Sequence, residues 1–129
     1  MTENDIAKKV LDVALRVHRG LGPGLLESVY ERVMAVTLGK DGLSVVTQRN
    51  VPIVFEGTRF EAGFRADLIV EDKVIVEIKS VATILAVHHK QLLTYLKLAD
   101  KRLGLLLNFN VALMKHGMHR VVDGLKEQT

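Results

Sequence analysis

The chain has 129 residues, 48% of them hydrophobic and 26% charged, with a formal net charge of +3 at pH 7. These values predict one globular domain over residues 1–129 and exclude both a disordered chain and two independent cores. The absence of cysteine excludes disulfides, thiolate nucleophiles, iron–sulfur clusters and the usual structural zinc sites, so any metal must be held by oxygen ligands or histidine.

The beginning of the chain, MTENDIAKK, is acidic and polar before any longer apolar stretch. A secretory signal has basic residues followed by an apolar stretch, so a cytoplasmic location is predicted. The longest apolar runs are only a few residues, far short of the roughly 20 that span a bilayer, and no membrane partner is expected.

The first helix is predicted over about residues 4–19. Thr2 and Asp5 stand before it at the spacing of a capping box. Three glycines and a proline over residues 20–24 then prevent the helix from continuing. Its buried stripe is predicted from apolar residues at helical spacing: Ile6, Val10, Val13 and Val17.

A second helix is predicted over about residues 26–40, and Asp41-Gly42 ends it. Its apolar residues also recur at helical spacing, which predicts a second buried stripe. The residues of that stripe are Leu26, Val29, Val33 and Val36 or Thr37.

From residue 43 the chain is rich in β-branched residues, which is typical of strands. Strands are predicted over residues 43–55, 60–70 and 73–79, joined by short turns. Pro52 indicates an edge strand or a bulge in the first of them, because proline cannot donate to a neighbouring strand.

A third helix is predicted over residues 86–99. The apolar run of residues 103–107, followed by Asn108-Phe109, is typical of a strand buried on both faces. A last short strand is predicted over residues 118–122. An antiparallel meander followed by a helical crossover predicts an α/β fold, with a mixed central β-sheet flanked by α-helices.

The strand over residues 73–79 carries charges where burial is expected. Alternate residues of a strand face opposite sides of the sheet, so Glu77 and Lys79 project from the same face, opposite Val76 and Ile78. A half-exposed salt bridge between the two charges is one interpretation. Asp67, in the preceding strand, favours another, because a hairpin at residues 71–72 brings it to the face that carries Glu77.

Two carboxylates and a lysine together have a chemical use. Asp67 and Glu77, with the backbone carbonyl of Ile78, are suited to hold Mg²⁺ or Mn²⁺. Such a metal lowers the pKa of a bound water and neutralises charge on a phosphoryl oxygen. The ammonium group of Lys79 would orient the attacking water or stabilise the phosphate.

The pattern Asp67…Glu77-Ile78-Lys79 resembles the D…ExK core of the PD-(D/E)XK nuclease superfamily. The resemblance implies a restriction-endonuclease-like core. It also implies a Mg²⁺- or Mn²⁺-dependent nuclease with Asp67 and Glu77 as metal ligands and Lys79 as the catalytic lysine. DNA is the expected substrate, ahead of RNA.

Two further motifs extend the resemblance over nearly the whole chain. Gln91 and Tyr95 match the QxxxY element of the RecB-like branch, which implies contact with the substrate backbone or support of Lys79. Gly24, Glu27 and Tyr30 match the heptad of the GxxExxY family. In the resemblance Glu27 completes the metal shell, directly or through water, and Tyr30 orients Glu27 or contacts the substrate.

Each of these residues has a plainer interpretation. Glu27 suits the first turn of a helix, where the dipole favours an acid. Tyr30 suits a core aromatic with its hydroxyl at the surface, and Gln91 with Tyr95 suits a solvated helix face. His88 lies three residues before Gln91 and could approach the phosphate.

The remaining histidines are weaker candidates. His88 and His89 are adjacent on a helix and point about 100° apart, so they cannot easily share one ion. We expect three others at the surface: His18, His116 and His119.

Two functions compete with the nuclease. The first is a catalytically silent module that binds nucleic acid or protein on a nuclease-like fold. The second is a structural partner domain, which would expose a large apolar surface around residues 103–107 or on the first helix. Aromatic residues make up only 5% of the chain, so contact mainly with phosphate is expected, and a homodimer or a partner protein would enlarge the DNA groove.

Overall fold

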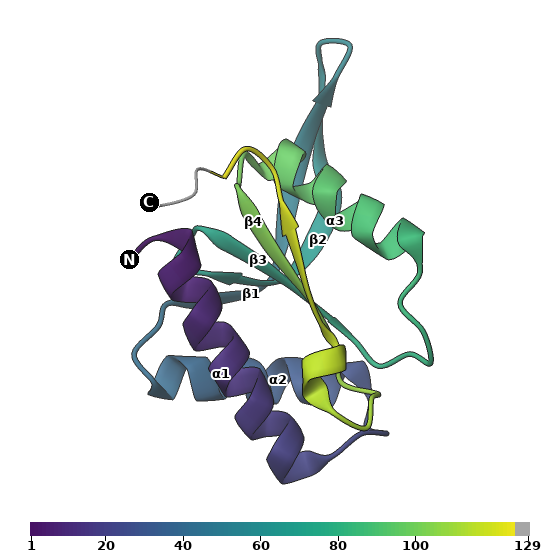
Figure 1. Ribbon diagram of the computed structural model, residues 1–129. Coiled ribbons are helices and arrows are strands. Elements are labelled where there is room, and N and C mark those ends of the chain that lie inside the picture. Colours follow the sequence, from purple (N-terminus) through teal and green to yellow (C-terminus); the bar gives the residue numbers. More distant parts are fainter. Residues whose placement is uncertain (126–129) are drawn as a thin grey trace.

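The computed structural model describes residues 1–125 and contains three α-helices, five strands and one short 3₁₀ turn (Figure 1). The helices are α1 (Glu3–Leu21), α2 (Glu27–Lys40) and α3 (Ala86–Ala99). The strands are β1 (Val45–Phe55), β2 (Thr58–Val70), β3 (Val74–Lys79), β4 (Leu103–Asn108) and β5 (Met118–Val122), and the 3₁₀ turn η1 covers Met114–His116. Every predicted helix and strand is confirmed, with ends shifted by two residues or fewer.

The five strands form one sheet in the order β1-β2-β3-β4-β5. β3 and β4 pair in parallel and the other neighbours pair antiparallel, so the predicted mixed sheet is confirmed. α3 makes the crossover between the two parallel strands, which have to be joined by a long connection. No helix in the described part of the chain is long and apolar enough to cross a membrane.

The sheet lies between two layers of helix (Figure 1). α1 and α2 cover one face and form the larger core with β2, β3 and β4. α3 covers the other face, where Leu92 and Leu96 pack on the sheet. Gly104 in β4 allows this approach, because a Cβ at that position would lie 2.9 Å from the side chain of Leu92.

α1 has the predicted start and the predicted buried stripe. The Thr2 hydroxyl accepts from the Asp5 amide at 3.1 Å and the Asp5 carboxylate accepts from the Thr2 amide at 3.0 Å, which makes a complete capping box. The residues predicted to be buried are all in the core: Ile6, Val10, Val13 and Val17.

α2 buries a different side from the predicted one. Tyr30, Met34 and Leu38 are fully buried at a spacing of four residues. Leu26, Val29 and Val36, predicted to be buried, are exposed, and Val33 is only partly buried. The prediction was wrong because α2 has apolar residues on two sides, and periodicity alone does not say which side meets the sheet.

β1 is an edge strand, and its register against β2 shifts between Val51 and Ile53. Pro52 lies at this shift, so both the edge and the irregularity predicted from proline are confirmed. The β1–β2 hairpin reaches beyond the rest of the sheet to its turn at Glu56-Gly57 (Figure 1).

The predicted faces of β3 are also confirmed. Val74, Val76 and Ile78 pack in the core under α1 and α2, whereas Ile75 packs under α3. The apolar run Leu103–Leu107 is buried throughout. The exposed surface that a structural partner domain would show on that strand is therefore not found.

Candidate active site

The position of Asp67 depends on an irregularity in β1 and β2. Thr47 pairs with Leu68 and Arg49 with Ala66, but the intervening Gln48 has a left-handed backbone with φ of 49°. Leu68 faces α1 and α2, yet Ala66 packs with the α3 cluster, although alternate residues normally share a face. The side chains of β2 therefore change faces of the sheet at Asp67.

The Asp67 carboxylate is held beside β3. Backbone pairing of β2 with β3 is present only from Leu68 to Val70. Next along β2, Asp67 Oδ2 accepts a hydrogen bond from the Ile78 amide at 2.9 Å. A side chain thus replaces a backbone partner, and this brings Asp67 to Glu77, as the hairpin predicted.

Glu77 is the most perturbed acid of this region. Its side chain is only 6% exposed, and Oε1 is buried without a hydrogen-bond partner. Burial, reinforced by the neighbouring Asp67 carboxylate, raises the pKa of Glu77 to about 9, against a smaller opposing effect of Lys79. No ion pair joins Glu77 to Lys79 among the described residues, so the salt-bridge interpretation is not supported.

Tyr95 and Gln91 of α3 lie at the same place. The Tyr95 ring stacks on Phe64 of β2, with centroids 3.9 Å apart. Burial raises the pKa of Tyr95, and the charges of Glu77 and Asp67 raise it further, while a hydrogen bond with Gln91 lowers it. Tyr95 is therefore adjacent to both carboxylates, whereas Gln91 is exposed on the next turn of the helix.

Glu27 contacts the end of β3 but not the carboxylate pair. Its Oε1 accepts from the Ser80 amide at 3.1 Å, and the Ser80 hydroxyl donates to the Leu25 carbonyl at 2.8 Å. Within residues 1–125 no three His, Asp or Glu side chains are grouped closely enough to hold a metal ion. The structure thus brings together Asp67, Glu77 and Lys79, and leaves Glu27 beside them.

Two residues that the sequence analysis missed lie next to the pair. Gln48 Nε2 donates to the Glu31 carboxylate and approaches Asp67 Oδ1 at 3.5 Å. Burial raises the pKa of Glu31, and the hydrogen bond from Gln48 lowers it by less. The negative charges of Asp67 and Glu27 raise the pKa further. Glu31 lies four residues after Glu27, so helical spacing was a usable signal for it. Nothing in the sequence pointed to Gln48.

Asn108 lies at the end of β4, and the sequence analysis gave it no role in the site. It is 2% exposed, and its side chain makes two hydrogen bonds to the backbone of Val81, at 3.1 and 2.9 Å. These bonds tie the loop that follows β3 to the neighbouring strand. They fix the position of the segment that follows Lys79 in the chain.

The predicted substrate contact of Tyr30 is wrong, because its side chain is fully buried. The ring stacks on Phe109 with centroids 4.5 Å apart. The hydroxyl donates to the Gly22 carbonyl at 2.6 Å and accepts from the Leu25 amide at 3.1 Å. Tyr30 therefore closes the glycine-rich loop before α2, with a buried hydroxyl and not a surface one.

The histidines have structural contacts. His88 Nδ1 accepts from the Leu85 amide at 2.9 Å at the start of α3, so its ring caps the helix. The rings of His89 and His119 meet edge to face at 5.1 Å. His18 was expected at the surface but is buried, and its ring bonds to the Val111 carbonyl at 2.7 Å. His116 is exposed, as predicted.

Comparison with known proteins identifies the family of the chain. A family model described as the PD-(D/E)XK nuclease superfamily matches residues 4–121. The searches of curated proteins and of solved structures returned no match. The narrower resemblances, to the GxxExxY family and the RecB-like branch, stay predictions. Since the match includes Asp67, Glu77 and Lys79 and spans most of the sequence, the chain belongs to the PD-(D/E)XK nuclease superfamily.

Proposed function

We propose that the chain is a metal-dependent nuclease that hydrolyses phosphodiester bonds, in DNA ahead of RNA, with Asp67, Glu77 and Lys79 as its catalytic set. One observation carries the proposal: Glu77 Oε1 is buried without a partner beside a second carboxylate. Buried polar atoms normally find a partner, and buried charges are paired or bind an ion. A pair of this kind is hard to explain as a structural contact.

The residues fit a hard divalent cation. The Asp67 and Glu77 carboxylates and the Ile78 carbonyl would hold Mg²⁺ or Mn²⁺, and Glu27 would act through a bound water. Magnesium is commonly held by one or two carboxylates while it keeps several waters, so a third protein carboxylate is not required. When bound, the metal supplies positive charge at the scissile phosphate and lowers the pKa of a water.

The other side chains act on the substrate. The Lys79 ammonium, next to Glu77, stabilises the charge that develops on the phosphate and orients the attacking water. Gln91 and Tyr95 contact the substrate backbone from α3. Gln48 keeps Asp67 in position through its amide.

Two exposed arginines, close to Asp67 along β1 and β2, suit contact with a phosphate backbone. Arg49 follows Gln48 in β1, and Arg65 lies two residues before Asp67 in β2; both are exposed. They lie on opposite faces of the paired strands, because Arg49 pairs with Ala66 and Arg65 pairs with Asn50. Phosphate contacts from such side chains give affinity without base sequence, which fits a chain with few aromatic residues.

The test compares cleavage of mixed DNA and RNA with Mg²⁺ or Mn²⁺ by wild type, Glu77→Ala and Lys79→Ala. Glu61→Ala, an exposed acid in the hairpin, is the matched control. The proposal expects cleavage that needs metal, is lost in both site variants and persists in the control.

Calorimetry with each metal adds a second measurement. The proposal expects binding by wild type and Lys79→Ala, and none by Glu77→Ala. Neither cleavage nor metal binding by folded wild type would instead favour the catalytically silent module.

A further inference from the structure

α2 has a second apolar side that faces solvent. Leu26, Val29 and Val36 are 72%, 38% and 57% exposed. With Val33 they recur at spacings of three and four residues, as the inner positions of a heptad do. Val33 is partly buried against the core, but Leu26, Val29 and Val36 do not pack in it, so packing of the core does not account for their positions.

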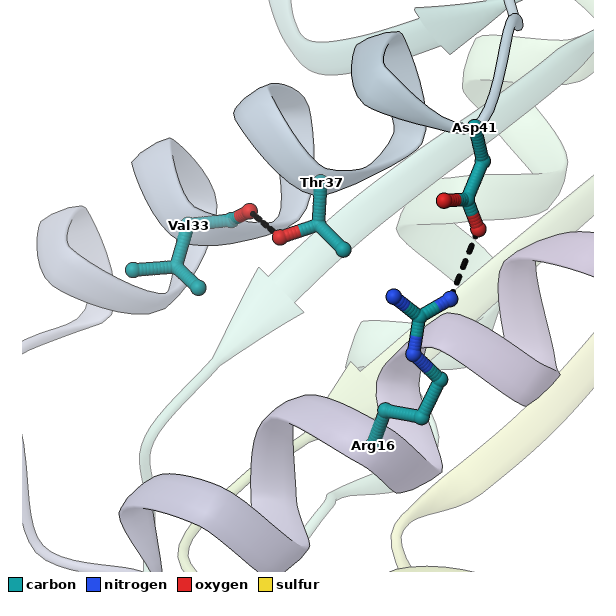
Figure 2. Close-up of polar contacts among 4 residues, drawn as sticks. All are labelled: Arg16, Val33, Thr37 and Asp41. Atoms are coloured by element: carbon teal, nitrogen blue, oxygen red, sulfur yellow. Dashed lines mark hydrogen bonds and ion pairs between the residues drawn. The ribbon is translucent and has the colours of Figure 1, made fainter.

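The stripe borders a groove of about 480 Å³. The groove is lined by Val29, Arg32, Val33, Val36, Thr37 and Lys40. Its one hydroxyl is already satisfied, because Thr37 Oγ1 donates to the Val33 carbonyl at 2.7 Å (Figure 2). The floor of the groove is therefore apolar, and an occupant does not have to supply a hydrogen bond to it.

The rim of the groove is basic. Asp41, the acid next to Lys40, is engaged by Arg16 of α1 at 2.7 Å (Figure 2). In the described part of the chain neither Arg32 nor Lys40 forms an ion pair. The occupant that complements this rim carries negative charge beside its apolar contacts.

We propose that the outer side of α2 binds an acidic amphipathic helix of a partner protein. A stripe with heptad spacing receives the side chains of a second helix. A second copy of this chain is the poorer fit, since a symmetric contact would set Arg32 and Lys40 against like charges. Nucleic acid is also a poorer fit, because its charged phosphates would lie over apolar valine side chains.

The partner would sit beside the candidate active site. A second hollow of about 300 Å³ shares Arg32 and Val36 with the groove and continues to Glu31 and Gln48. A helix that covers the groove therefore ends near the residues that hold Asp67, without occupying the carboxylate pair. The docking surface is independent of the proposed nuclease chemistry.

The test selects binders from a display library of randomised helical peptides on the wild-type chain. The expected peptides have apolar residues at spacings of three and four with Asp or Glu beside them. They bind Val36→Asp at least about tenfold more weakly than wild type, since a charge at the centre of an apolar contact is costly. Val122→Asp, the same change at a 48% exposed valine of β5, leaves binding unchanged.

Charge reversal makes the test specific. The double variant Arg32→Glu with Lys40→Glu is expected to select peptides with Lys or Arg in place of Asp or Glu. Circular dichroism checks that each variant folds, and Val36→Ser replaces Val36→Asp if the latter does not. Calorimetry with Mg²⁺ or Mn²⁺ gives the same result for Val36→Asp as for wild type, whatever the nuclease assay shows.

Three results would overturn the proposal. The first is a set of selected peptides without acidic enrichment, or with equal binding to Val36→Asp. The second is a dimer in sedimentation equilibrium that Val36→Asp dissociates, which would make a second copy the occupant. The third is Val36-dependent binding to phosphatidylserine vesicles with no binding to the acidic peptides, which would make the surface a membrane contact.

Discussion

The two faces of the sheet are built for different purposes. Under α1 and α2 the central positions are all apolar, as with Val76, Ile78 and Leu105, and they join one continuous core. Under α3 the apolar cluster is smaller, and β3 passes from Ile75 into Glu77 and Lys79 on that side. One face thus provides stability, whereas the other gives up apolar packing to bring charges together.

Changing Lys79 has the largest expected effect on the α3 face. Lys79→Ala should lower kcat about 1,000-fold, near 4 kcal/mol of transition-state stabilisation, because a charged group acting on the phosphate is lost. Unfolding by urea should be almost unchanged. Lys97→Ala, an exposed lysine of α3, is the control. If Lys79→Ala lost stability as well as activity, the α3 face would also be needed for stability, and the two faces would not differ in role.

Met34 tests the opposite face. Met34→Ala should lower the free energy of unfolding by about 3 kcal/mol, since it leaves a cavity in the larger core. Val36→Ala, on the exposed side of the same helix, should change stability by only about 0.5 kcal/mol. Thermal and urea unfolding of both variants measures the difference, and similar losses would show that both sides of α2 support the fold.

Glu77 belongs to the candidate site, but its protonation also makes the stability of the fold depend on pH. Its carboxyl keeps a proton up to a pKa of about 9 in the folded chain, against 4.5 as the ordinary value. Between these values the folded state holds more protons than the unfolded state. Stability should therefore fall as pH rises, by up to about 1.4 kcal/mol per pH unit.

Glu77→Gln removes this proton equilibrium while it keeps the shape. Without divalent metal, and near pH 8, it should be more stable than wild type by about 2 kcal/mol or more. The two proteins should converge below about pH 4.5, where Glu77 is protonated in both the folded and the unfolded state. Urea unfolding with a chelator over this range measures the effect, and parallel stability curves would contradict the raised pKa of Glu77.

The smallest effect concerns Gln48. Gln48→Ala removes the amide that bridges Glu31 and Asp67. Metal affinity should fall about tenfold, because residues that hold a ligand in place contribute this much in metal sites. Thr47→Ala, the preceding exposed position, is the control. Calorimetry measures the change directly, and unchanged affinity would show that Asp67 needs no support beyond the Ile78 amide.

Local patterns predicted the placement of several candidate site residues in the fold. Alternation in β3 placed Glu77 and Lys79 on one face, and the hairpin at residues 71–72 brought Asp67 to them. Spacing in α3 predicted that Gln91 and Tyr95 share one side. These inferences held because each depends on a short segment whose geometry follows from its own residues.

Tyr30 and Gln48 show where local patterns fail. Tyr30 stands in a motif beside Glu27, yet its environment comes from Phe109, far along the chain. Gln48 reaches Asp67 because its backbone is left-handed at the position opposite Asp67, and no residue pattern predicts that conformation. In both cases the deciding neighbour is distant in sequence.

The sequence by itself determined the order of the elements, the alternating faces of β3 and the carboxylate–lysine set, because periodicity and turn residues act over a few positions. Only the tertiary structure decided which apolar side of α2 enters the core, since both sides satisfy the same helical spacing. It also decided that Glu77 Oε1 is left without a partner and that Gln48 reaches Asp67. Burial and long-range contact depend on all the layers at once, and the free energy that selects among locally equivalent arrangements comes from packing them together.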